Sequence, residues 1–203
     1  MTKTYLDKVY ETDPEDLTGL YDAWAGGYDS ELADNGYATP ARVAAALAGR
    51  APDRTAPLLD WGCGTGMGGA ALAREGFTTL DGCDLSEGML AEARAKGVYR
   101  TLWQLAVDAP LPFVLADFPL VTAIGVISTG AAPPALLTEI AEGLAPGALL
   151  ALSFNDHTLD DPAYTGTLAR TFSDGLLAKR HEDYGDHLPG QGLKSMVYVL
   201  EKL

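Results

Sequence analysis

The spacing of apolar positions changes along this chain, and the first part of the chain has helical spacing. In residues 1–50, the stretch TDPEDLTGLYDAWAGGYDSELA places Tyr21, Trp24 and Tyr28 on one face of a predicted helix. Such an aromatic stripe is typical either of plain core or of a lid that closes over a ligand. Gly26 and Gly27 are expected to interrupt this helix where it would need to bend, and each costs about 1 kcal/mol relative to Ala inside a helix, which favours the lid.

Capping residues set the expected bounds of two helices in this part of the chain. Asp13 predicts an N-cap with Pro14 in the first helical position, and the DNG sequence that ends at Gly36 stops that helix. A second helix is expected to begin with Thr39 as its cap and Pro40 as its first residue.

Beyond residue 50, short apolar runs alternate with stretches of helical spacing. Ser86 is the expected N-cap of one of these helices and Gly97 its end. Strands alternating with helices predict an α/β fold, a parallel sheet with helices on both faces. The strands are expected within 56–61, 77–84, 99–107, 118–128 and 148–154, and the helices within 67–76, 86–97 and 134–147.

Near the end of the chain the spacing of apolar positions changes. Residues 176–184 and 193–202 alternate apolar and polar positions, with GDHLPGQG between them. This pattern predicts a hairpin, so the sheet is expected to end in antiparallel strands. Without an internal repeat or a linker, residues 1–203 are interpreted as one domain, with residues 1–50 as its helical lid.

Composition and charge limit the classes of molecule that this protein is expected to bind. Of the 203 residues 47% are hydrophobic, enough for a globular core, and the net charge is −14. That charge repels nucleic acid and anionic membranes and leaves small molecules, or basic proteins, as easier partners. No signal peptide and no apolar run of about 18 residues is evident. Cys63 and Cys83 are expected to be free, buried fillers, and the protein is expected in the cytoplasm.

The glycine-rich stretch LLDWGCGTGMGG can be aligned with a ligand-binding motif in two registers. Gly64, Gly66 and Gly69 fit the dinucleotide fingerprint, and Asp84 follows Gly64 by 20 residues. This register predicts NAD or FAD. It conflicts with Asp60, because a carboxylate at the mouth of the loop repels a pyrophosphate.

The second register begins with that acid and continues with Gly62, Gly64 and Gly66. Asp60 then favours a ligand with positive groups, such as S-adenosylmethionine with its sulfonium and ammonium, directly or through water. The glycines let the backbone approach the ligand closely. The alternative for Asp60 is a plain hydrogen-bond acceptor at the end of a strand.

Asp84 fits either register, because a carboxylate at the end of the second strand can accept both hydroxyls of a ribose. Leu85 and Met89 are apolar candidates to line an adenine. The alternatives are an acid that accepts from free amides at a helix start, for Asp84, and ordinary helix core for the two apolar residues.

Together these segments resemble the class I S-adenosylmethionine-dependent methyltransferases. LLDWGCGTG matches that family's first motif, DGCDLSEGMLAEAR its second-strand acid and following helix, and GLAPGALLALSF its late turn and strand. YDAWAGGYDSEL resembles its opening segment. With GVIS on the fourth strand, the chain is most similar to the methyltransferase-like subgroup named after the Williams–Beuren syndrome region.

The resemblance implies a Rossmann-like seven-stranded sheet in the order 3-2-1-4-5-7-6, with the seventh strand antiparallel. It also implies the cofactor S-adenosylmethionine. Asp60 and the three loop glycines would cradle its methionine part, Asp84 its ribose, and Gly125 would pass close to it. Tyr28, with Trp24, would reach it from the lid.

This chain departs from the family pattern at two places. Family members often carry an acid after the third strand that contacts the adenine amine, but Ala106 stands there, and Asp108 comes two residues later. Asp108 is therefore an open candidate for that contact. Pro119, near the start of the fourth strand, lacks an N–H, so strand pairing is expected to begin after it.

Methyl transfer depends mainly on orientation and needs a general base only when the acceptor holds a proton. His157, after the fifth strand, is a weak candidate for that base. His181 and His187 lie near two aspartates in the hairpin, yet no metal motif spacing is met, which favours a solvated rim and no metal. The expected function is methylation of an unidentified small molecule. A nicotinamide-dependent oxidoreductase and a non-catalytic S-adenosylmethionine-binding protein remain alternatives.

Overall fold

The computed structural model describes Lys8, Thr12 and residues 16–203. Its elements are α2 (Leu17–Asp34), α3 (Thr39–Ala48), β1 (Leu58–Trp61), α4 (Met67–Arg74), β2 (Leu80–Asp84), α5 (Glu87–Lys96), β3 (Thr101–Gln104), η2 (Leu115–Asp117), β4 (Leu120–Ala123), α6 (Ala135–Gly143), β5 (Leu149–Asn155), α7 (Asp156–Asp160), α8 (Pro162–Ser173), β6 (Leu177–Leu188), η3 (Pro189–Gln191) and β7 (Leu193–Lys202).

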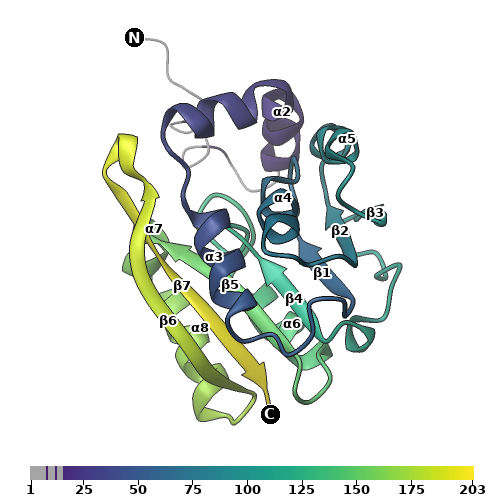
Figure 1. Ribbon diagram of the computed structural model, residues 1–203. Helices are drawn as coiled ribbons and strands as arrows, with labels where there is room; N and C mark the ends of the chain where they lie inside the picture. Colours follow the sequence, from purple (N-terminus) through teal and green to yellow (C-terminus); the bar gives the residue numbers. More distant parts are fainter. Residues whose placement is uncertain (1–7, 9–11, 13–15) are drawn as a thin grey trace.

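The strands form one seven-stranded sheet in the order β3-β2-β1-β4-β5-β7-β6, which confirms the expected order (Figure 1). The first five strands are parallel to one another, whereas β7 pairs antiparallel with both β5 and β6. The predicted hairpin is therefore confirmed. The α2 helix lies beyond the carboxyl ends of the parallel strands, at the edge where ligands of open α/β sheets bind (Figure 1).

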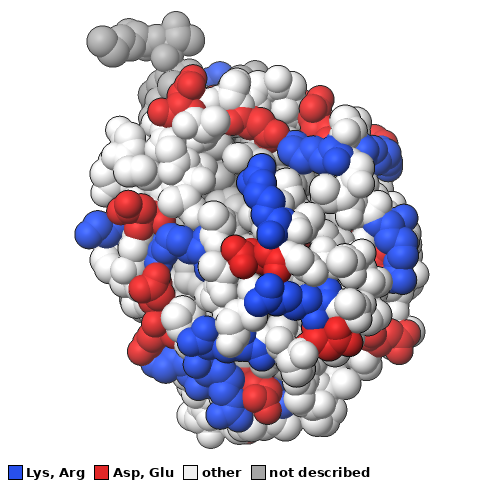
Figure 2. Space-filling model, viewed as in Figure 1, with Lys and Arg blue, Asp and Glu red and all other residues white. Residues whose placement is uncertain are grey.

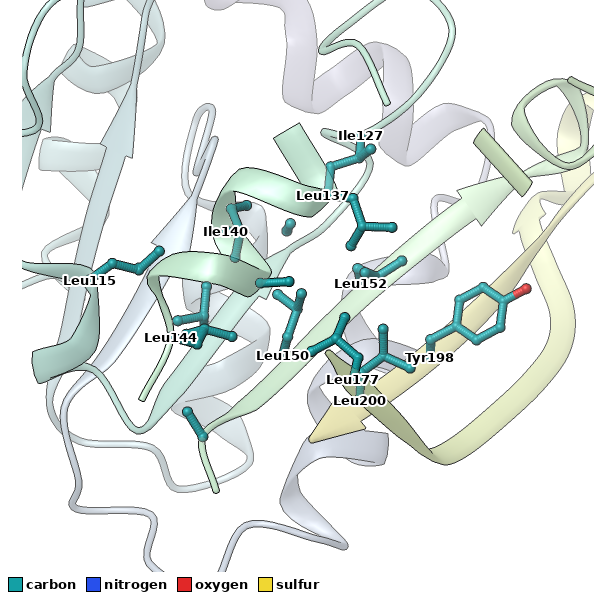
Figure 3. Packing of buried hydrophobic residues seen from close by; sticks show 14 of the residues in the cluster. Leu115, Ile127, Leu137, Ile140, Leu144, Leu150, Leu152, Leu177, Tyr198 and Leu200 are labelled. Carbon is teal, nitrogen blue, oxygen red and sulfur yellow. The ribbon is translucent and has the colours of Figure 1, made fainter. Parts of the chain in front are cut away.

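Successive side chains of a strand point to opposite faces, and this alternation gives the sheet two buried layers. Leu58 and Leu149 pack with α3 and α4 on one face. Leu59 and Leu150 belong to the layer on the other face, with α6 and α8. Figure 3 shows part of this second layer between α6, β5 and β7. Helices on both faces confirm the fold predicted from the alternating pattern.

The capping predictions had different outcomes. Ser86 accepts a hydrogen bond from the Met89 amide at 3.0 Å, and Gly97 ends α5 in the left-handed region, so both are confirmed. Thr39 was wrongly predicted as a cap. It is the first residue of α3, and its hydroxyl is turned to the hairpin. Asp13 and Pro14 lie outside the described residues.

Other bounds also differ from expectation. The α2 helix runs without a break through Gly26 and Gly27, where an interruption was expected. The β4 strand begins after Pro119, as predicted, but ends at Ala123, where the chain turns to form the ligand edge. The sequence interpretation did not identify α8, although the capping pair Asp161 and Pro162 signals its start.

Candidate functional site

A cavity of about 780 Å³ opens at the carboxyl ends of the parallel strands. Its walls come from α2, the glycine loop after β1, the end of β2, the loop after β3 and the segment between β4 and α6. A volume of this size is in the usual range for small-molecule and cofactor sites. The charged side chains among the described residues that line it are Asp84, Asp108 and Glu139, all acidic.

The glycine loop meets this cavity with backbone. Gly62 and Gly64 line the cavity, and both have positive φ angles, of 63° and 53°. A Cβ at Gly62 would lie 2.5 Å from the Val126 side chain, whereas a Cβ at Gly64 would meet nothing within 4 Å. Gly66 instead faces α5, where a Cβ would lie 3.3 Å from Ala93. The first two glycines thus present backbone to the cavity, and the third permits close packing of helices.

Asp60 lies beneath the loop and is not in the wall of the cavity. It is 1% exposed, and its two carboxylate oxygens accept hydrogen bonds from Thr122 and Tyr99, each at 2.7 Å. Burial raises the pKa of Asp60 to about 6, against the lowering effect of these two donors. Tyr99 in turn accepts from the Gly69 amide at 3.1 Å, so Asp60 holds β1, β4 and the start of α4 together.

Thr122 and Tyr99 were not anticipated. They contact Asp60 across 62 and 39 residues, so no local pattern announces the pair.

Asp84, in contrast, faces the cavity. One of its oxygens accepts from the Gly64 amide and the other from the Ser86 amide, both at 2.9 Å. Burial raises the pKa of this carboxyl above its usual value, and the amide donors oppose that effect. A carboxylate has about four acceptor positions, so each oxygen retains capacity for a ligand hydroxyl. Asp84 therefore orders the loop and remains available to the cavity.

Other predicted residues lie around the same cavity. Leu85 and Met89 both line it, Leu85 being 40% exposed and Met89 buried. Gly125 lines it with a φ of 71°. Ala106 and Asp108 are both in its wall.

Comparisons with known proteins find similarity to methyltransferases. A family model for the methyltransferase domain matches residues 58–147. Human methyltransferase-like protein 27 is 37% identical over 140 residues, which cover 66% of this chain and 56% of that protein. The chain thus spans little more than half the length of this curated relative. Residues 58–147 thus resemble a methyltransferase domain, within a sheet whose strand order is the one expected for the class I S-adenosylmethionine-dependent enzymes.

Solved methyltransferase structures share the fold. Magnesium protoporphyrin IX methyltransferase from Synechocystis PCC 6803, solved with bound S-adenosylmethionine, superposes with a TM-score of 0.60 at 20% identity, over 81% of this chain and 78% of that chain. A complex between the Trm112 methyltransferase activator of Haloferax volcanii and a methyltransferase gives 0.61 at 21% identity, over 88% and 96%. S-Adenosylmethionine is thus the cofactor bound in a structure that shares this fold.

The residues present fit that cofactor. Its charged groups include a sulfonium and an ammonium, and the cavity offers carboxylates from Asp84, Asp108 and Glu139. The open space beside Gly64 leaves room for a group in contact with backbone. A dinucleotide would bring two phosphates to these same carboxylates, at a cost from like-charge repulsion. The sign of the cavity's charge therefore separates the two registers that the glycines alone left open.

Two latches join α2 to the rest of the site. Asp22 accepts hydrogen bonds from the Gly88 amide, at 3.0 Å, and from Ser86 at the start of α5. Asp29 accepts from Thr65 in the glycine loop, at 2.5 Å, and pairs with Lys96 at 2.6 Å. These acids lie on the polar side of α2, which sequence reasoning left without a role.

The aromatic stripe of α2 divides between two environments. Trp24 is 2% exposed, packs between Tyr21 and Tyr28, and donates to Glu31 at 2.9 Å. Tyr21 and Tyr28 are half-buried and line the large cavity, whereas Trp24 lines a second, smaller one of about 60 Å³. The stripe is thus core at its middle and cavity wall at its ends.

The histidines differ from expectation. His187 was predicted on a solvated rim, but it is 7% exposed and lines the second cavity, because the hairpin folds back over α3. His181 contacts Arg50 away from both cavities. His157 lies at the exposed surface of α7, outside the walls of either cavity. Within the described residues, no cluster of three metal-ligating side chains occurs.

Across the described part of the chain, no helix has both the length and the apolar character needed to cross a membrane.

Proposed function

We propose that this protein is an S-adenosylmethionine-dependent methyltransferase and that it methylates a small molecule bound beneath α2. The observation that carries the proposal is the large cavity, which combines backbone of the glycine loop, Asp84 and acidic side chains under a helix. When bound, S-adenosylmethionine supplies an electrophilic methyl group on a sulfonium.

The chain's own residues would hold and shield that group. Asp84 would accept the ribose hydroxyls, and Leu85 and Met89 would cover the adenine. Gly62, Gly64 and Gly125 would bring backbone close, and Asp60 would fix the loop from below. Burial raises the pKa of Tyr28 well above its usual value, so its hydroxyl stays protonated and would donate to the cofactor's carboxylate. Asp108 would approach the adenine amine.

A small-molecule acceptor is supported by the surface charge. The net charge is −14, and basic side chains on the face in Figure 2 have acidic neighbours. Arg42 pairs with Asp183 and Arg180 with Glu201, at 2.8 and 2.7 Å. Mixed, paired charge of this kind offers no continuous track for a phosphate backbone.

The proposal is tested by calorimetry followed by an acceptor screen. S-Adenosylmethionine and S-adenosylhomocysteine should bind, whereas NAD(H) and NADP(H) should not bind comparably. Turnover of S-adenosylmethionine to S-adenosylhomocysteine in a small-molecule library would identify the acceptor. Tight dinucleotide binding without binding of the sulfur ligands would contradict the assignment. Cofactor binding with turnover only on a protein or nucleic acid would contradict the small-molecule acceptor.

A further inference from the structure

The second cavity adjoins the first one, since Tyr21, Tyr28 and Gly125 belong to the walls of both. The rest of its wall comes from α2, Tyr37 in the loop before α3, the loop after β4, the end of β5, and His187 and Leu188 of the hairpin. None of the described residues that line it is an aspartate, glutamate, lysine or arginine. This cavity is therefore a small chamber beside the large cavity, lined by aromatic and uncharged polar side chains, with the imidazole of His187 in its wall.

A chain of buried hydroxyls determines which nitrogen of His187 carries the proton. Arg42, which can only donate, gives a hydrogen bond to the Ser195 hydroxyl oxygen at 3.0 Å. Ser195 lies 2.9 Å from the Thr39 hydroxyl, which lies 2.8 Å from Nδ1 of His187. Buried hydroxyl protons need acceptors. The arrangement that satisfies both hydroxyls is donation from Ser195 to Thr39 and from Thr39 to Nδ1.

In that arrangement Nδ1 accepts, so the proton of the neutral imidazole lies on Nε2. Burial lowers the pKa of His187 to about 4, which keeps the ring neutral at physiological pH. Nε2 makes no hydrogen bond with the described residues, and it is not among their buried polar atoms that lack a partner, so it is accessible. Because His187 lies in the wall of the second cavity, its accessible N–H is available to a ligand there.

The chemistry of this chamber selects its occupant. A carboxylate or phosphate there would lose its hydration without a cationic side chain to compensate, and an ammonium would oppose the Nε2–H donor. Water occupies about 30 Å³ in the liquid, so a cavity of about 60 Å³ admits only a few non-hydrogen atoms. Aromatic walls favour a hydroxyl carried on a flat ring.

We propose that the second cavity is the acceptor subsite and holds an uncharged phenolic hydroxyl, whose oxygen accepts a hydrogen bond from Nε2–H of His187. This inference rests on the proposed function, because it assigns the acceptor of that same reaction. His187 would orient the hydroxyl by donating to one of its lone pairs. On transfer, the S–CH3 bond of the sulfonium would break as the O–CH3 bond forms, leaving S-adenosylhomocysteine. The phenolic proton would pass to water in the adjoining large cavity, because Nε2 already carries a proton. The remainder of the acceptor would extend towards the large cavity.

The first experiment is nitrogen NMR of histidine-labelled wild-type protein in complex with S-adenosylhomocysteine. Long-range proton–nitrogen correlations distinguish the two neutral tautomers of each ring, so this measurement needs no variant. We expect His187 to be neutral at pH 7 with its proton on Nε2. A proton on Nδ1 would overturn the proposal, because Nε2 would then be an acceptor.

The second experiment titrates phenol, benzoate and benzylamine into the same complex. Phenol should shift the Nε2 resonance of His187 with a dissociation constant at least fivefold lower than the other two probes. His187→Asn retains an amide near the position of Nδ1 for Thr39 and removes Nε2, so phenol binding, followed by ligand-detected NMR, should weaken at least fivefold. His181→Asn, on the same hairpin but outside the cavity, should bind phenol like the wild type.

Calorimetry with S-adenosylhomocysteine separates this proposal from the proposed function. If the ligand binds and phenol leaves the His187 resonances unchanged, the subsite is wrong and the methyltransferase assignment stands. Equal affinity for benzoate or benzylamine would also overturn the acceptor class. If S-adenosylhomocysteine itself does not bind, the proposed function fails first. Should His187→Asn not fold, the wild-type titration decides alone.

Discussion

The β1–β2 half of the sheet builds its side of the site from backbone and one carboxylate, whereas the β4–β5–β7 half builds its side from distant side chains. In the first half, Gly62, Gly64 and Asp84 come from a stretch of 23 residues. In the second half, Tyr28 and His187, from opposite ends of the chain, line the same small cavity as Gly125. The common cofactor would be held by the compact half, and the particular acceptor by the dispersed half.

The two acids at the strand ends of the compact half also differ from each other, because one belongs to the scaffold and the other faces the cavity. Asp60 is 1% exposed, with both oxygens occupied by Thr122 and Tyr99, and fixes the scaffold. Asp84 faces the cavity and keeps acceptor capacity. If the cavity holds the cofactor, Asp60 would thus act on it through the loop, whereas Asp84 would contact it directly.

The largest effect is expected for the loop glycines. In Gly62→Ala, the new methyl group would lie 2.5 Å from Val126 at a φ of 63°, so steric overlap adds to backbone strain. We expect a loss of about 2–5 kcal/mol in the free energy of unfolding, measured by urea titration. Gly64→Ala is the matched variant, with the same kind of φ but open space, and should lose only about 1–2 kcal/mol.

The Gly64→Ala methyl group would project where a ligand approaches. Its affinity for S-adenosylhomocysteine should therefore fall more than its stability does. Equal losses of stability in the two variants would show that the Val126 contact does not constrain the loop.

The next prediction compares the buried acid of the compact half with the buried histidine of the dispersed half. The folded-state pKa of His187 is lowered from 6.5 to about 4, so its contribution to stability is present above pH 6.5 and lost as the pH falls towards 4. The pKa of Asp60 is raised from 3.8 to about 6, so its contribution is present below pH 3.8 and lost as the pH rises through 6. Each amounts to about 3 kcal/mol, with opposite signs.

Single variants should reveal these opposing contributions. Between pH 6.5 and 4, Asp60→Asn should lose about 3 kcal/mol of unfolding free energy relative to the wild type, and His187→Asn should gain about as much. The measurement is chemical denaturation at several pH values, with the wild type subtracted at each one. A difference independent of pH would contradict the burial of that group.

The contrast between the halves also explains what the sequence could predict. Alternating strands and helices and the hairpin pattern predicted the fold, because both depend on local spacing. Asp84 could be placed because it follows its strand directly. The position of His187 could not be predicted, since it depends on a hydrogen bond with Thr39, which lies 148 residues earlier in the chain. Thr39 was wrongly predicted as a cap because a Thr-Pro pair is typical of a helix start. The sequence pattern does not show that the Thr39 hydroxyl forms hydrogen bonds with the hairpin instead.

Asp84→Ala tests whether the compact half holds the cofactor. Hydrogen bonds to a charged group contribute about 1.5–3 kcal/mol each, so affinity for S-adenosylhomocysteine should fall at least tenfold in calorimetry. Asp108→Ala, at the exposed rim of the same cavity, is the comparison and should have a smaller effect. Retained affinity in a folded Asp84→Ala protein would mean that the acid only orders the Gly64 and Ser86 amides.

The smallest effect is expected at the latch between α2 and the compact half. Asp29→Asn weakens the contact with Lys96, a partly exposed pair with side chains 42% and 24% accessible, worth about 0.2–1 kcal/mol. If α2 is a lid, this loss should increase local opening of residues 17–32, measured by hydrogen exchange, with little change in global stability. Binding of S-adenosylhomocysteine should protect the same residues, because Tyr28 and the latch would then close over the ligand.

Glu182→Gln removes a similarly exposed ion pair, that with Lys179 on the hairpin, and should leave exchange in α2 unchanged. Equal protection of α2 with and without ligand would instead make the helix a permanent wall, with Trp24 as its core anchor.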